Sequence, residues 1–209
     1  MMPNLLPRSA RTIRLFLYAL CGLAGWPGAA HATDEITPGA IPVCYNFGCN
    51  TRDIVGITPE EWKQVTGWFI EPAGNAEQER IQIRKAVGWL EVIVGRHTPI
   101  HLDLGQDDLS EGRLGQMDCI DEEKNVTAFL QLFQNQGLLR FHRVTEPAYR
   151  RTAWDQHWAG QIEEIENRQR WVVDSWFQDY GKNPYIQKSE QWSDIPFIFS
   201  SSYIDNSPD

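Results

Sequence analysis

The sequence predicts an α+β domain in which N-terminal helices pack on an antiparallel sheet. Between residues 58 and 137, apolar side chains recur at helical spacing in three stretches. Runs with strand character follow at residues 139–145, 156–165 and 170–177, and the polar stretch between the last two predicts an antiparallel hairpin. Residues 33–41 are predicted to be a loosely held polar segment. The chain after residue 178 is predicted to be loop, with a helical turn near Trp192.

The first two helices are predicted from their capping residues. Thr58 is a good N-cap, with Pro59 at the first helical position and Glu61 completing a capping box. A second helix should begin at Asn75 and stop at Gly95. Its apolar positions follow at spacings of four, three and four, and we expect them in the core: Ile83, Val87, Leu90 and Val94.

Residues 1–32 have the pattern of a secretory signal peptide. Arg8, Arg11 and Arg14 precede a short apolar run at residues 15–26, and Ala-His-Ala follows at residues 30–32. The run is shorter than the roughly 20 residues that a membrane helix needs. We therefore expect cleavage after Ala32, a periplasmic or secreted protein, and no stable membrane insertion of the mature chain.

Residues 33–209 form a single predicted domain with an acidic surface. The whole chain has a net charge of −9, from 19 basic and 28 acidic residues. Three of the basic residues and none of the acidic ones lie in the leader, so 16 basic residues remain against 28 acidic ones, a charge of −12. This balance argues against a nucleic-acid partner and against binding to anionic membranes.

The cysteines divide into a pair and a single thiol. Without Cys21 of the leader, three remain: Cys44, Cys49 and Cys119. Cys44 and Cys49 end a short loop that contains Gly48, so we expect a structural disulfide, with a redox-active pair as the alternative. Cys119 is then the unpaired cysteine.

Cys119 lies at the predicted start of a third helix. Asp118 is its expected N-cap, Asp121 stands three residues further, and Gly137 is the expected stop. Free backbone N–H groups at such a position favour the thiolate form of a cysteine and can bind an oxyanion. The alternative is a buried structural cysteine.

Two residues of the predicted hairpin suggest an acid–base pair. Asp174 interrupts the otherwise apolar run RWVVDSWF, and a buried carboxylate requires a partner. We expect that partner to be His157, directly opposite Asp174 if the turn is centred on Ile165-Glu166; a shift of two residues would change the partner but not the sheet face. His142 is a rival base, but it is flanked by Arg140 and Arg143, and we expect no buried acid near it in sequence.

The stretches DCIDEEKNVTAFLQLFQNQGLL, QHWAGQIEEI and RWVVDSWF together resemble the transglutaminase-like superfamily of papain-type thiol enzymes. The nearest resemblance is to the bacterial exported transglutaminase-like cysteine proteinases, and it covers residues 114–177. It implies a papain/transglutaminase-like fold, with Cys119 as nucleophile, His157 as general base and acid, and Asp174 orienting the imidazole. Gln116, just ahead of the nucleophile, is our choice for the second oxyanion donor beside the Cys119 amide.

The resemblance implies an exported cysteine peptidase or amidase that acts on a protein or peptide through a thioester. The alternatives are a protein-glutamine transglutaminase and an inactive exported binding domain that uses tryptophans to hold a glycan or peptide. The tryptophans considered for such a surface are Trp62, Trp68, Trp154 and Trp192.

No cofactor is implied, although two metal sites were considered. Four acidic residues crowd the start of the third helix and oppose a thiolate at Cys119, unless their side chains point to water; they could instead bind calcium: Asp118, Asp121, Glu122 and Glu123. His97 and His101 have zinc-like spacing, but Pro99 lies between them in a predicted loop, residues 96–115, so a solvated acidic loop is favoured over a metal site.

Overall fold

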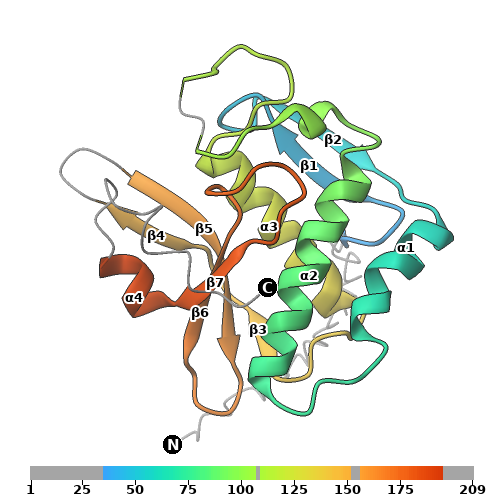
Figure 1. Cartoon of the computed structure of the whole chain (residues 1–209), viewed down its shortest axis with the longest axis vertical. Coiled ribbons are helices and arrows are strands. Elements are labelled where there is room, and N and C mark those ends of the chain that lie inside the picture. The colour runs from blue at the N-terminus through green and yellow to red at the C-terminus, as the bar shows by residue number, and fades with distance from the viewer. Residues whose placement is uncertain (1–34, 107–108, 152–155, 195–209) are drawn as a thin grey trace, which may run out of the picture. The chain divides into compact units, whose positions relative to one another are not determined.

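The computed structural model describes residues 35–106, 109–151 and 156–194, which belong to one compact unit (Figure 1). The predicted signal peptide and its cleavage site lie outside these residues. In the described part of the chain, none of the helices combines the length and the apolar character needed to span a bilayer.

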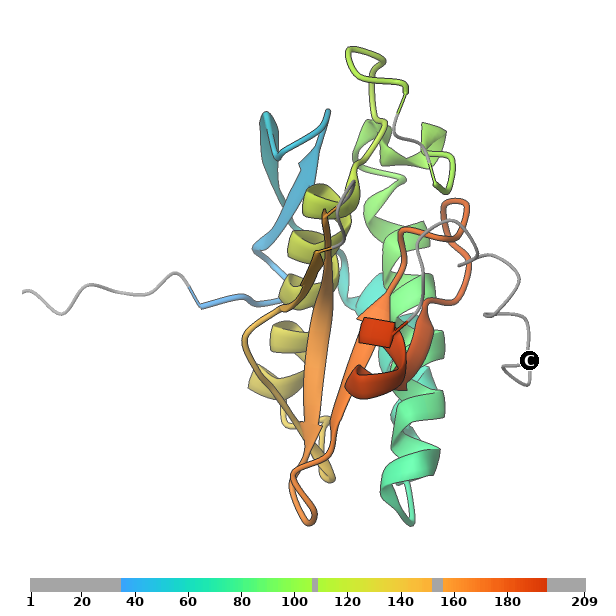
Figure 2. The ribbon, with the colours of Figure 1, turned by 90° about the vertical axis from the view of Figure 1, so that its left-hand side faces the viewer.

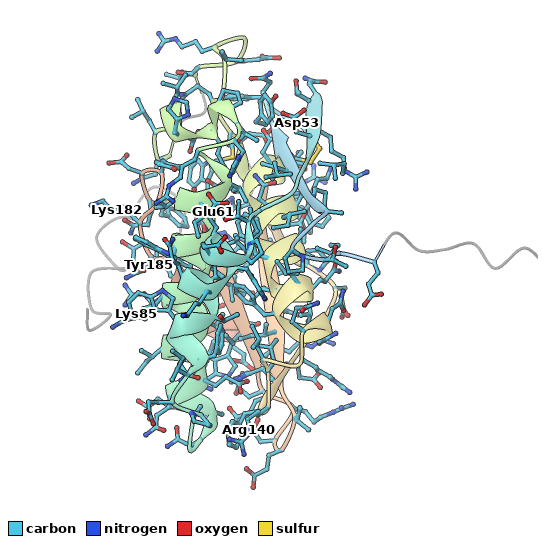
Figure 3. All side chains as sticks on the ribbon, turned by 90° about the vertical axis from the view of Figure 1, so that its right-hand side faces the viewer. Asp53, Glu61, Lys85, Arg140, Lys182 and Tyr185 are labelled. Carbon is cyan, nitrogen blue, oxygen red and sulfur yellow. A yellow bond between two sulfur atoms is a disulfide. The ribbon has the colours of Figure 1, made fainter. Side chains whose placement is uncertain are left out.

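The structure is α+β, as predicted, and the predicted helix starts are confirmed. Helix α1 spans Pro59–Thr66, and its capping box joins Thr58 to Glu61, which is labelled in Figure 3. Helix α2 spans Ala76–Val94, between the N-cap Asn75 and the C-cap Gly95, and its four predicted core positions are fully buried. Two 3-10 helices, Gly67–Phe69 and Pro99–Leu102, follow α1 and α2. Helix α3 spans Cys119–Asn135 and α4 spans Ser189–Asp194, which places a helical turn at Trp192 as expected.

Within the described residues, seven strands form two antiparallel sheets. A hairpin joins β1 (Ile41–Tyr45) to β2 (Thr51–Val55). The larger sheet has the order β3-β5-β6-β7, with bounds His142–Val144, Gln156–Glu164, Arg170–Asp174 and Tyr185–Lys188. Strand β4 (Ala148–Arg151) pairs with the first half of β5, on the same edge as β3.

Strands β1 and β7 correct two sequence predictions. Ile41 belongs to β1 and is fully buried, so the polar N-terminal segment gives way to a core strand at that residue. Strand β7 begins directly after Pro184, in a region predicted to be loop. Its four residues are too few for a clear period-two pattern, and pairing with β6 stabilises them as a strand.

Helix α3 is the central element of the core. It lies between the β1–β2 hairpin and strand β5, as Figure 2 shows with α3 in yellow-green, the hairpin in blue and β5 in orange. The close approach of α3 to β5 depends on Gly160, where an added Cβ would lie 2.7 Å from Cγ1 of Val126. This packing fixes the start of α3, and therefore Cys119, relative to the sheet.

Candidate active site

Cys119 occupies the first position of α3 and is partly exposed, without a disulfide partner. Asp118 caps the helix, because its Oδ1 accepts hydrogen bonds from the amides of Ile120 (3.1 Å) and Asp121 (2.9 Å). Gly115 allows the chain to enter this turn. Its φ is +80°, and a side chain there would collide with the carbonyl of Pro99. The predicted helix start is therefore confirmed.

The Cys44–Cys49 disulfide is present, and its loop is docked on the start of α3. The amide of Gly48 donates to Oδ2 of Asp118 (2.9 Å), and that of Cys49 donates to Oδ1 of Asp121 (2.6 Å). These two carboxylates therefore bind backbone amides. Among the described residues, no group of three or more acidic, histidine or cysteine side chains is arranged to hold a metal ion.

Three of the four acidic residues at the start of α3 do not point to water. Asp121, Glu122 and Glu123 are all buried. Burial, then the charge of Glu91 on α2, raises the pKa of Glu122 well above its ordinary value. Burial, then the charge of Asp118, raises the pKa of Asp121 to about 7. Burial therefore favours the neutral form of these two acids over the charged one.

His157 and Asp174 form a buried pair on the sheet. Nε2 of His157 lies 2.9 Å from Oδ2 of Asp174, and the two residues are 1% and 2% exposed. The same carboxylate oxygen accepts a hydrogen bond from Nε1 of Trp192 on α4 (2.8 Å). The amide of Trp176 donates to the other oxygen (3.3 Å). Asp174 therefore has the partners that a buried carboxylate requires.

The strand register differs from the predicted one by two residues. Gly160 pairs with Val173 and Glu163 with Arg170, so the turn is centred one residue later than predicted and His157 is not directly opposite Asp174. A shift of two residues leaves both side chains on the same face. The imidazole reaches the carboxylate diagonally, and its ring centroid lies 5.0 Å from the ring of Trp176.

Cys119 completes the cluster on the other side of the imidazole. Cys119 lies close enough to the imidazole to raise the pKa of His157, and because Nε2 faces Asp174, the nitrogen left for the sulfur is Nδ1. Burial alone would lower the pKa of His157, but the charge and hydrogen bond of Asp174, followed by those of Cys119, raise it to about 9. The ring is therefore an imidazolium at neutral pH. Trp176 and Phe177 pack together against Cys119.

Gln116, the predicted oxyanion donor, is buried close to the helix start. Its side-chain amide donates to the carbonyl of Leu102, while Oε1 has no hydrogen-bond partner.

The other three histidines of the described chain have partners elsewhere. His142 is buried, with Nδ1 2.9 Å from Oε1 of Glu79. His97 approaches Glu61 through Nε2 (3.1 Å), and His101 directs Nδ1 at the carbonyls of Gly95 and Thr98.

The candidate binding tryptophans do not form one surface. Trp192 is buried on α4, and Trp62 packs against the main core. Trp68 is exposed on the 3-10 helix after α1, and Trp154 lies outside the described residues.

Sequence reasoning missed the role of Trp192, which was considered only as part of a binding surface. Its indole donates to Asp174 and lies 5.6 Å from the imidazole of His157 between centroids. Arg150 contacts Trp192 in two ways: its Nη1 donates to the Trp192 carbonyl (2.8 Å), and its guanidinium lies over the indole ring. The only signal in the sequence was a single tryptophan within a polar stretch. Such a tryptophan indicates a buried side chain but not which element its indole contacts.

Comparison with known proteins adds no relative: no family model, no curated protein and no solved structure matches this chain.

Proposed function

We propose that this chain is a thiol hydrolase that cleaves a peptide or amide bond through a Cys119–His157–Asp174 triad. The observation that supports the proposal most is the cluster of the Cys119 sulfur, the His157 imidazole and the Asp174 carboxylate. The carboxylate lies against the imidazole, and the raised pKa of His157 favours the imidazolium form at neutral pH. A thiolate beside an imidazolium at a helix N-terminus is the arrangement that activates cysteine for attack on carbonyl carbon.

The proposed reaction has two steps. The Cys119 sulfur attacks the carbonyl carbon, the His157 imidazolium gives its proton to the leaving amine, and the carbon–nitrogen bond breaks to leave a thioester. Water then attacks the thioester while the imidazole accepts its proton, which releases the acid and restores the ion pair. The backbone amide of Cys119 and the side-chain amide of Gln116 are the proposed donors to the oxyanion.

We also propose that the protein acts outside the cytoplasm, on a protein or peptide. A structural disulfide persists in an oxidising compartment, and the Cys44–Cys49 bridge holds the loop that docks on the start of α3.

Alkylation kinetics test the nucleophile without knowledge of the substrate. A free cysteine is about 3% thiolate at pH 7, so a preformed ion pair should react with iodoacetamide about ten-fold faster than free cysteine. Cys119→Ser should abolish labelling and His157→Gln should slow it. The matched control is His97→Gln, on an exposed histidine outside the site, which should leave the rate unchanged.

Hydrolysis is tested with a fluorogenic peptide library, and amine transfer with dansylcadaverine. Turnover that needs Cys119 supports the hydrolase, whereas dansyl incorporation into glutamine side chains would replace it with transglutaminase activity. A Cys119 that alkylates no faster than free cysteine would overturn the triad and leave the binding-domain alternative.

A further inference from the structure

Two hollows border the exposed side of α3, away from its buried stripe. They adjoin each other, because both are lined by Thr127 and Gln131. Four residues at helical spacing form the floor of what we call the α3 groove: Lys124, Thr127, Gln131 and Gln134.

The two ends of the α3 groove differ in chemistry. The end beside the β1–β2 hairpin is lined largely by apolar groups, including Pro42, Ala128 and the Cys44–Cys49 disulfide. The other end, a hollow of about 660 Å³, is lined by three arginines of the large sheet: Arg143, Arg168 and Arg170. An occupant that fits both ends is apolar at one end and anionic at the other.

The three arginines are held in place by one buried acid. Glu163 lies 2.6 Å from Arg143, 3.1 Å from Arg168 and 3.6 Å from Arg170, and its side chain is only 7% exposed. Arg170 also pairs with the exposed Glu146 (2.8 Å). Each guanidinium has five N–H donors, so two carboxylates leave most of the donors of three arginines available.

The charge of the α3 groove is opposite to that of the whole chain. Its lining carries five basic residues (Arg52, Lys124, Arg143, Arg168, Arg170) and three acidic ones (Glu123, Glu146, Glu163), in a chain of net charge −9. A groove with a net positive charge attracts anionic ligands and repels cationic ones, although the protein as a whole is acidic.

The dimensions of the α3 groove favour a polypeptide. From Lys124 to Gln134 a helix rises about 15 Å, which an extended chain spans in about five residues. We propose that the α3 groove binds a short, extended, acidic segment of a partner protein, with its apolar residues beside the disulfide and its carboxylates on the three arginines.

Fluorescence anisotropy of the full chain with a labelled hexapeptide tests this proposal. The probe carries two leucines followed by four glutamates, and the matched probe has glutamines in place of the glutamates. We expect the glutamate probe to bind at least about ten-fold more tightly, and binding to weaken as salt rises.

Variants then locate the bound probe. Arg143→Gln combined with Arg168→Gln should weaken binding about ten-fold, and Lys124→Gln about three-fold, because exposed charge pairs contribute modestly. The control is Arg96→Gln, an exposed arginine that pairs with Glu61 outside the α3 groove, and it should change nothing.

Four outcomes would overturn the proposal. One is equal binding of the two probes, and another is loss of binding in the Arg96 control to the same extent as in the double variant. The third is loss of binding after alkylation of Cys119, which would place the probe in the candidate active site. Competition by inorganic tripolyphosphate at equal concentration would likewise overturn the proposal, because the α3 groove would then bind polyanions in general rather than a polypeptide.

Discussion

Replacing Asp174 by asparagine should remove the charge that holds His157 as an imidazolium. The pKa of His157 is raised from 6.5 to about 9, and this difference corresponds to about 3 kcal/mol of stabilisation of the folded state. Because the pKa is higher in the folded state, the stabilisation is fully present below pH 6.5 and is lost as the pH rises through 9. In Asp174→Asn, burial lowers the pKa of the imidazole and only Cys119 still raises it, so most of the stabilisation that the parent loses between pH 6.5 and 9 is absent at every pH.

Urea unfolding of parent and Asp174→Asn at pH 6 and pH 9.5 measures the effect. The difference in unfolding free energy between the two proteins should narrow by about 3 kcal/mol at the higher pH. Glu122 also narrows this difference as the pH rises, because the charge of Asp174 is one cause of the raised pKa of Glu122 in the parent. NMR titration of the His157 ring therefore isolates the imidazole.

A matched variant separates this effect from general destabilisation. Glu60→Gln, on the exposed first turn of α1, should show the same difference from the parent at both pH values. If the Asp174→Asn difference is also constant, or if the ring of His157 titrates near 6.5 in the parent, the reasoning about the pair is refuted.

Three further substitutions test the surroundings of the site. Trp192→Phe keeps an aromatic ring but removes the N–H that donates to Asp174, so iodoacetamide labelling of Cys119 should slow and its pH profile should shift. An unchanged pH profile would mean that the indole acts only by packing. Glu91→Gln should stabilise the protein. Burial, then the charge of Asp103, raises the pKa of Glu91 to about 8 in the folded state. Above pH 4.5 the unfolded chain gains a charge at this residue that the folded state disfavours, and glutamine removes this penalty. The gain in urea unfolding should grow to at most about 5 kcal/mol by pH 8 and vanish below pH 4.5; a gain independent of pH would contradict it. Gly160→Ala should cost about 1–3 kcal/mol in the same assay, because the added Cβ would lie 2.7 Å from α3, and an unchanged stability would mean that α3 can shift.

Much of the local structure was predictable because its causes are close in sequence. The capping boxes at Thr58 and Asp118 involve residues three apart, so the starts of α1 and α3 followed from the sequence. The Cys44–Cys49 pairing followed from loop length and cysteine count. The expectation that His157 and Asp174 share a face also held, because side chains alternate along a strand whatever the register.

The remaining features depend on contacts between distant segments. The hairpin register was off by two residues, since a shift of two conserves the face pattern on which the prediction rested. The burial of Glu122 is set by the packing of α3 against α2, which helical periodicity does not describe.

The sequence by itself determined where the helices begin, which cysteine stays free, and the order of a thiol, an imidazole and a carboxylate along the chain. Only the tertiary structure decided that Trp192 binds Asp174, that three acidic residues of the first turn of α3 are buried, and that three arginines gather around Glu163. Capping and periodicity act over one or two helical turns. Hydrogen bonding and burial between segments depend on which surfaces meet, and this is fixed only when the whole core packs.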